Sequence, residues 1–289
     1  MTEVEDRTRA LLAPPSTSVD GDARAALRQQ LVARLGPLVA PLPLAGPMVV
    51  TLPLLRQARA HPESLAAPDE PFAWRPVFVR RSLGLAAVEA CAGGRFRTPL
   101  DAVGPVAAEA VERWEQTGWR AFHWEPWMAG LAAGARAVVL AEAVGWASSL
   151  WSSLDWSVLG SRPQFGGADD QWACPSTHTV RMKGRTELRV PVNDRGPGEA
   201  VVENGGNTAL VSVSGGCPSR VCRAELAYLA LVASLRSPSR PVPVRVVGVW
   251  PDAGVARSVE IDAPALAAAA DLVVDVVAIV AGSRRPVSA

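Results

Sequence analysis

Four cysteines and three histidines are the residues of this chain best suited to metal binding or nucleophilic chemistry. Four positions separate Cys217 from Cys222, whereas Cys174 and Cys91 lie well upstream of this pair. Structural zinc sites usually combine two close pairs of ligands, so the spacing favours buried thiols over a zinc or iron–sulfur centre. We therefore expect no metal at these cysteines, with Cys217 and Cys222 forming at most a redox-sensitive pair.

Other motifs of enzyme chemistry do not occur in the sequence. The two serines of the segment VSVSGG, Ser212 and Ser214, lack the glycine two positions earlier that a nucleophile elbow requires. The histidines His61 and His178 have no nucleophile pattern around them, and no Walker A loop or dinucleotide fingerprint is present. A mechanism that needs a lysine ammonium has one candidate, because Lys183 is the only lysine.

Composition and charge describe a globular chain. Of the 289 residues, 49% are hydrophobic, and the formal net charge is +1, so no overall field attracts nucleic acid or anionic membrane. The N-terminus, MTEVEDRTR, is acidic and polar and has no signal-peptide pattern, so we expect a cytoplasmic protein with reduced thiols. Charged residues interrupt the apolar stretches 129–150 and 263–281, which predicts buried helices and no membrane span.

The clearest structural signal is a strand, a glycine turn and a helix in succession. Residues 208–214 form a short apolar run that Gly215 and Gly216 end, and residues 219–235 follow with a helical spacing of apolar positions. A second apolar run at 242–250 predicts another strand. A strand, crossover helix and strand usually place two parallel strands side by side, so we expect this arrangement here.

The remaining segments suggest three parts. We expect a loosely packed lead-in and one helix in residues 1–44, a helical part in 45–160 and an α/β core in 161–289. Within the core, residues 162–176 are expected to form a loop, and residues 178–192 a pair of short strands or one bent strand.

Three segments together resemble a known nuclease family. They are GRTELRV (184–190), ALVSVSGG (209–216) and RAELAYLALVASL (223–235). Their order is similar to the core of RecB-like nucleases of the PD-(D/E)XK superfamily, which has an acid on one strand, an acid-x-lysine on the next, and a helix with glutamine and tyrosine. The resemblance implies an α/β fold with a restriction-endonuclease-like mixed central sheet flanked by helices, after an N-terminal helical elaboration.

The resemblance assigns family positions to five residues of this chain. Glu187 matches the first acid, and Tyr228, the only tyrosine, matches the aromatic residue of the helix. Ser212 stands where the second acid belongs, and Ser214 where the lysine belongs. Glu225 stands at the glutamine. The family holds Mg²⁺ or Mn²⁺ with its two carboxylates, so this pattern implies a vestigial site.

The departures from the family pattern predict lost catalysis. A serine hydroxyl is a neutral, weak metal ligand, and a serine in place of lysine removes the charge that stabilises the transition state. The opening helix also lacks the usual histidine, because Ala87 or Val88 occupies that position. Loss of one catalytic acid or base reduces the rate by ~10²–10⁴-fold, so two losses leave little activity. Lys183, which alternation places on the side of Glu187, is the main candidate for a relocated catalytic group.

The sequence leaves three functions open. The first is a catalytically inactive nuclease-like scaffold or nucleic-acid-associated subunit in DNA repair, defence or chromosome maintenance, with DNA and a helicase or other protein as partners and no cofactor. The second is an active Mg²⁺- or Mn²⁺-dependent nuclease with relocated catalytic residues, and the third is a protein-interaction module. In the first, five arginines line a groove for phosphates, namely Arg181, Arg185, Arg189, Arg220 and Arg223.

Overall fold

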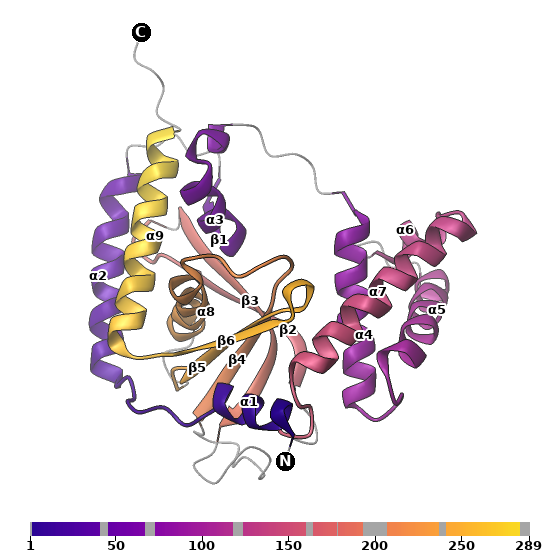
Figure 1. The fold of residues 1–289 in the computed structure, drawn as a ribbon. Coiled ribbons are helices and arrows are strands. Elements are labelled where there is room, and N and C mark those ends of the chain that lie inside the picture. Colours follow the sequence, from indigo (N-terminus) through magenta and orange to yellow (C-terminus); the bar gives the residue numbers. More distant parts are fainter. Residues whose placement is uncertain are drawn as a thin grey trace.

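The computed structural model describes residues 2–40, 46–66, 73–117, 124–159, 164–177, 179–192, 207–236 and 241–283. In these residues a mixed open β-sheet lies between two groups of helices, which is the α/β class expected from the sequence (Figure 1). The strands are β1 (Met48–Thr51), β2 (Gln164–Ala173), β3 (Val180–Val192), β4 (Asn207–Val213), β5 (Arg245–Trp250) and β6 (Val255–Glu260).

The long strand β3 organises the sheet. The strand order of the sheet is β1-β3-β4-β5-β6. β2 lies outside this order and pairs with β3. β1 pairs in parallel with residues 180–183 of β3, and β4 pairs antiparallel with residues 188–192. Because β2 occupies one edge of β3 over both regions, β1 and β4 must share the opposite edge, with residues 184–187 between them.

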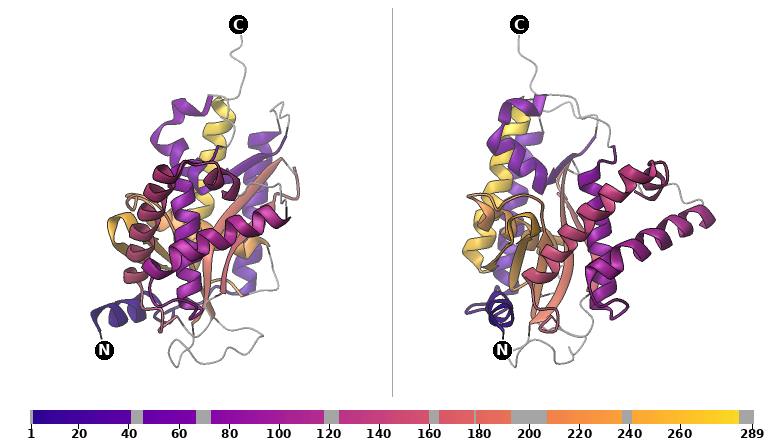
Figure 2. Two further views of the ribbon diagram at one scale, coloured as in Figure 1. Left: turned by 90° about the vertical axis from the view of Figure 1, so that its right-hand side faces the viewer. Right: turned by 45° about the vertical axis from the view of Figure 1, so that its right-hand side comes forward.

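Helices cover the two faces of the sheet separately (Figure 2). The first group packs on one face and comprises α2 (Gly21–Val39), α3 (Leu52–Ala60), α8 (Cys222–Arg236) and α9 (Ala263–Ser283). The second group packs on the other face and comprises α4 (Pro76–Ala92), α5 (Pro99–Thr117), α6 (Glu125–Ala129) and α7 (Ala133–Ser153). The short 3₁₀ helices are η1 (Pro62–Ala66) and η2 (Pro251–Ala253).

Even-numbered residues of β3 face α8 in its first half and the α4–α7 group in its second half. Met182 packs in the core beneath α8, and an added Cβ at Gly184 would touch Leu229 of that helix at 3.4 Å. Leu188 and Val190 instead pack against the α4–α7 group. Even-numbered positions in a regular strand share one face, so the alternation changes phase between residues 184 and 188. Glu187 lies in this irregular stretch.

The parallel pair expected around the glycine turn is confirmed. β4 and β5 are parallel neighbours with Ser212 opposite Gly248, and α8 connects them. The expected loop at 162–176 is wrong, because residues 164–173 form β2. Its polar sequence hides the strand, and in residues 170–173 burial alternates, with Asp170 and Trp172 buried. A register shift between Phe165 and Ala168 further interrupts the pattern.

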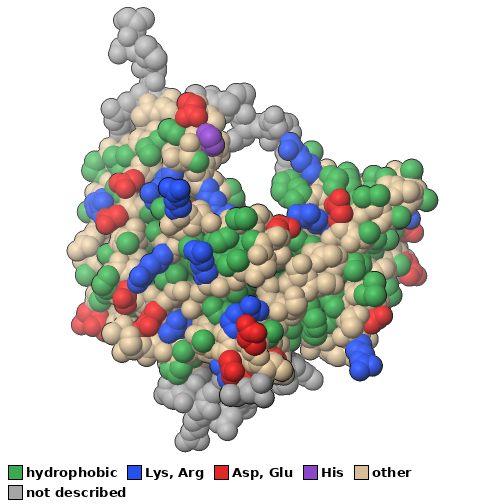
Figure 3. Space-filling model, viewed as in Figure 1, with side chains coloured by type: hydrophobic (Ala, Val, Ile, Leu, Met, Phe, Trp, Pro, Cys, Tyr) green, Lys and Arg blue, Asp and Glu red, His purple; other side chains and the backbone are tan. Residues whose placement is uncertain are grey.

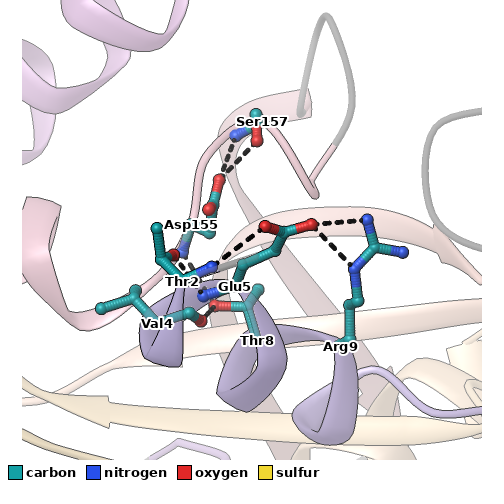
Figure 4. A network of polar contacts seen from close by, with 7 residues as sticks. All are labelled: Thr2, Val4, Glu5, Thr8, Arg9, Asp155 and Ser157. Atoms are coloured by element: carbon teal, nitrogen blue, oxygen red, sulfur yellow. Dashed lines mark hydrogen bonds and ion pairs between the residues drawn. The ribbon is translucent and has the colours of Figure 1, made fainter.

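The expectation of a loosely packed start is also wrong. Helix α1 (Glu3–Leu11) begins with a capping box formed by Thr2 and Glu5, and Leu11 is buried against the α4–α7 group. Figure 4 shows how Thr8 joins α1 to the segment after α7. Its hydroxyl donates to the Val4 carbonyl and accepts the Asp155 backbone N–H at 2.8 Å. The expected domain boundaries, near residues 44 and 160, lie outside the described residues.

Helix α9 is the one helix in the described residues that is long and apolar enough to cross a membrane. It packs instead against α2 and α8, with 56% of its most apolar window buried. Its outer side carries the exposed acids Asp271 and Asp275, and Asp271 accepts a hydrogen bond from Arg34 of α2 at 2.5 Å. These features are typical of a core helix.

Candidate functional site

Glu187 lies in the part of β3 between the segment that pairs with β1 and the segment that pairs with β4. Between Lys183 and Leu188 the edge of β3 opposite β2 has neither β1 nor β4 as a partner, so the last backbone groups of β4 need other partners. The Glu187 side chain is 3% exposed, and its Oε2 accepts the Val213 backbone N–H at 2.8 Å. The carboxylate therefore completes the hydrogen bonding of β4.

The second oxygen of Glu187 is bound by arginine. Arg81 of α4 donates from Nη2 to Glu187 Oε1 at 2.5 Å, and Arg185 Nε lies 3.9 Å from the same oxygen. A charge-assisted bond of this length is among the stronger interactions of a protein. Because the carboxylate is buried, Arg81 supplies the positive charge that it needs.

A second acid, Asp252, also binds an arginine of α4. Asp252 lies in η2, which directly follows β5, and its Oδ1 accepts a hydrogen bond from Arg80 at 3.0 Å. Its Oδ2 accepts the Gly216 backbone N–H at 2.8 Å, in a turn where Gly216 has a φ of +73°. This positive φ explains the glycine. The carboxyl ends of the parallel strands β4 and β5 thus meet two neighbouring arginines of α4.

Sequence reasoning missed three of these residues, namely Arg80, Arg81 and Asp252. Their signals were an arginine pair in the opening helix, expected at 78–92, and an acid two residues after the strand expected at 242–250. Loops at the carboxyl ends of parallel strands commonly carry functional groups, so this acid was a reasonable candidate.

The two serines lie on the α8 side of β4. Ser212 and Ser214 alternate with Val211 and Val213, whose side chains pack against the α4–α7 group. Ser212 lies opposite Gly248, where an added Cβ would touch Leu226 of α8. Both serines are buried, and alternation directs them away from the face on which Arg81 approaches.

Tyr228 and Glu225 of α8 have structural partners of their own. The Tyr228 hydroxyl lies 2.8 Å from the Val50 carbonyl of β1 and 3.0 Å from the Lys183 carbonyl of β3, so it bridges the two strands. Burial raises the pKa of Tyr228 above its ordinary value. Glu225 is buried and pairs with Arg56 of α3 at 3.0 Å.

Lys183 lies on β3 as expected, but its side chain is exposed, and Arg81 is the residue that binds the carboxylate. The five arginines predicted to form one groove are distributed over different surfaces. Arg181 and Arg185 are exposed on the face of β3 opposite α8. Arg189 instead pairs with the buried carboxylate of Asp170 at 2.6 Å.

The last two arginines lie near the start of α8. Arg220 is exposed just before the helix, and Arg223 lines a pocket between α8 and α9. Since α8 packs on the other face of the sheet, these two residues are separated by the sheet from Arg181 and Arg185.

The carboxylate does not fit a catalytic Mg²⁺ or Mn²⁺ ion. Both oxygens of Glu187 already accept hydrogen bonds, and Arg81 places a positive charge where such an ion would bind. Within the described ranges, no three His, Cys, Asp or Glu side chains are grouped to hold a metal. Cys91, Cys174 and Cys222 are buried free thiols, and Cys217 is an exposed one.

Comparisons with protein-family models, with curated proteins and with solved structures find no match to this chain.

Proposed function

We propose that this protein is a catalytically silent, nuclease-like protein that binds nucleic acid through its phosphate backbone. The observation that carries the first half is the Glu187 carboxylate, whose two oxygens accept the Val213 N–H and an Arg81 N–H. A metal-dependent nuclease needs this carboxylate free to ligate an ion. An arginine gives the site charge balance without the ability to activate water.

The order of elements supports the nuclease-like half of the proposal. Helix α4 precedes β2, β3 and β4, and β3 pairs antiparallel with each of the other two. The crossover helix α8 then leads to β5, which is parallel to β4. Glu187 is on β3, directly beside the end of β4, and Tyr228 of α8 bonds to β3. This arrangement follows the order of the three segments that resemble RecB-like nucleases.

An open, basic stretch of sheet supports the nucleic-acid half. Arg181, Lys183 and Arg185 are exposed at alternate positions of β3, so their side chains project from one face about 6.6 Å apart. Arg181 and Lys183 have no ion-pair partner among the residues that the structure describes. Register neighbours of Lys183 are the polar residues Thr51 and Gln171. Unpaired cations in a row suit a phosphate backbone.

The binding proposal is tested by titrating labelled single- and double-stranded DNA at several salt concentrations. We expect salt-sensitive binding that weakens when Arg181 and Lys183 are both changed to glutamine. For single strands, the loss of two contacts should reduce the slope of log K against log salt by about 1.4. The matched control changes the exposed Arg97 and Arg113 of the helical group to glutamine, with the same loss of charge. Equal weakening in both variants would refute a site on β3.

The proposed absence of catalysis has its own assay. We expect no cleavage of labelled DNA in Mn²⁺ by the wild-type protein, because Arg81 holds Glu187. Cleavage that disappears in Glu187→Gln would show an active site and reject the proposal. A helicase or another protein subunit is the partner that the sequence resemblance suggests, and co-purification would identify it.

A further inference from the structure

An apolar pocket lies on the opposite side of the sheet, between the first turns of α8 and α9. Its volume is about 350 Å³. Apart from Arg223, its lining is apolar and consists of Val221, Ala224, Ala227, Pro264, Ala265 and Ala268. Small side chains leave this space open at the point where the two helices approach each other. A pocket of this size falls in the range of small-molecule sites.

One arginine lines this apolar pocket, and another lies close to it in the chain. Arg223 lines the pocket, and Arg220 lies three residues before it. Both are exposed, and within the described part of the chain neither has an ion-pair partner. Arg257 of β6 contacts the first residue of α8, with its Nη1 3.7 Å from the Cys222 thiol. Figure 3 shows Lys and Arg side chains interspersed with hydrophobic ones over α8 and β6.

Asp262, which directly precedes α9, has a structural task. Asp262 accepts the Ala265 backbone N–H at 2.7 Å, so it caps the first turn of the helix. Asp262 is therefore occupied by the helix, whereas Arg223 at the pocket and Arg220 beside it have no acid partner among the described residues. An uncharged apolar ligand would leave these cations unused, and a cationic ligand would be repelled by them.

We propose that this pocket binds a small amphipathic anion, with its apolar body between α8 and α9 and its carboxylate, phosphate or sulfonate at Arg223. The volume accommodates roughly a dozen non-hydrogen atoms, taking about 30 Å³ for each. Charge-assisted hydrogen bonds from a guanidinium would fix the anionic group, and apolar burial would provide the remaining affinity. This site is independent of the proposed nucleic-acid surface on β3.

Decanoate is the test probe, because it joins one carboxylate to an apolar chain of suitable size. Calorimetric titration of the full-length protein, below the concentration at which decanoate forms micelles, should show one binding site. Arg223→Gln should weaken binding roughly tenfold. Ala268→Leu should weaken binding strongly, because its three added carbon atoms take up about 90 Å³ of the pocket. Decyltrimethylammonium, which has the same chain and a positive head group, should not bind.

Two control variants distinguish this site from non-specific adsorption. Ala267→Leu adds the same side chain at the neighbouring exposed position of α9, and Arg97→Gln removes an arginine from the helical group. Both should bind decanoate as the wild type does. The proposal fails if decanoate does not bind, or if Ala268→Leu and Ala267→Leu bind it equally. Failure here would leave DNA binding by Arg181 and Lys183 unaffected, so the two proposals fail separately.

Discussion

At the scale of single residues, the pairing of Glu187 with Arg81 defines the candidate site. A buried carboxylate can be neutralised by a metal, a proton or a basic side chain, and each choice supports different chemistry. Here the basic side chain comes from α4, and its positive charge beside Oε1 disfavours a metal ion at that oxygen. Removing one partner of such a pair is strongly destabilising, so the pair is also part of the fold.

Tyr228 gives a prediction of the same scale. Its buried hydroxyl bridges β1 and β3, and its raised pKa means that the folded protein keeps the proton at a pH where the unfolded chain loses it. Stability from this group is complete below the unfolded pKa of about 10 and declines as the pH rises above it. Tyr228→Phe should lower the free energy of unfolding at pH 7 by about 1 kcal/mol.

Urea unfolding at pH 7 and at several pH values above 10 measures both effects. The wild type should lose up to about 1.4 kcal/mol per pH unit more steeply than Tyr228→Phe. The comparison is simple because the chain has one tyrosine and one lysine. Parallel stability curves for the two proteins in the alkaline range would contradict the assignment.

At the scale of elements, the close approach of α4 and α7 determines how Arg80 and Arg81 reach the sheet. Gly84 of α4 faces Trp146 of α7, and an added Cβ would lie 2.5 Å from the Trp146 ring. Trp146 belongs to the hydrophobic core that also contains Val213 at the end of β4. The glycine therefore allows α4 and α7 to pack closely, and in this position Arg80 and Arg81 of α4 bind Asp252 and Glu187.

Gly84→Ala should therefore destabilise the protein by about 1–3 kcal/mol through overpacking. Gly145→Ala, one residue before Trp146 in α7, is the matched control. No atom lies within 4 Å of its added Cβ, so this change should be neutral or stabilise by about 0.5–1 kcal/mol. Urea unfolding of both variants measures the difference. Equal free energies of unfolding would show that the helices can separate without cost.

At the scale of the whole molecule, the N-terminal segment contacts both the end of α7 and the strands β5 and β6, which are distant from it in the chain. Helix α1 contacts the end of α7, and the residues after it continue to the edge of the sheet. There Glu260 of β6 accepts hydrogen bonds from the Ser16 hydroxyl and backbone N–H and from the Thr17 N–H. Arg245 of β5 also donates to the Ala13 carbonyl at 2.5 Å. The segment is therefore attached to β5 and β6 through side chains of both strands.

Glu260 makes this attachment sensitive to acid. Hydrogen bonds from the Ser16 hydroxyl and N–H, and then Thr17 and Arg245, hold the pKa of Glu260 below its ordinary value. A lowered pKa contributes stability above the unfolded pKa of about 4.3, and this contribution is lost as the pH falls through the folded value. Hydrogen exchange at Ser16 and Thr17 should therefore become faster, relative to the intrinsic rate, as the pH falls below about 4.

Glu260→Gln should show fast exchange at Ser16 and Thr17 already at pH 6, while the amides of β4 stay protected. Glu63→Gln is the control, because Glu63 is an exposed acid whose nearest partner is His61 at 3.4 Å. Mass-spectrometric hydrogen exchange of the three proteins measures the effect. Unchanged exchange in Glu260→Gln would show that the segment is held by α1 alone.

The sequence predicts the elements whose patterns are local. The apolar run of β4, its glycine turn, α8 and β5 are all where periodicity places them, and the parallel pairing follows from their order. The strand β2 cannot be predicted in this way, because its polar residues are compatible with a loop. It forms only when β3 provides an edge for its hydrogen bonds.

The sequence by itself determined the α/β class, the β4–α8–β5 unit and the position of Glu187 on a strand, because these depend on hydrophobic spacing over a few residues. Only the tertiary structure decided what the carboxylate does. Arg81 is 106 residues away from Glu187 in the chain, and the packing of α4 against α7 and the sheet brings the two side chains together. No local pattern encodes such a contact, because its geometry depends on the whole core.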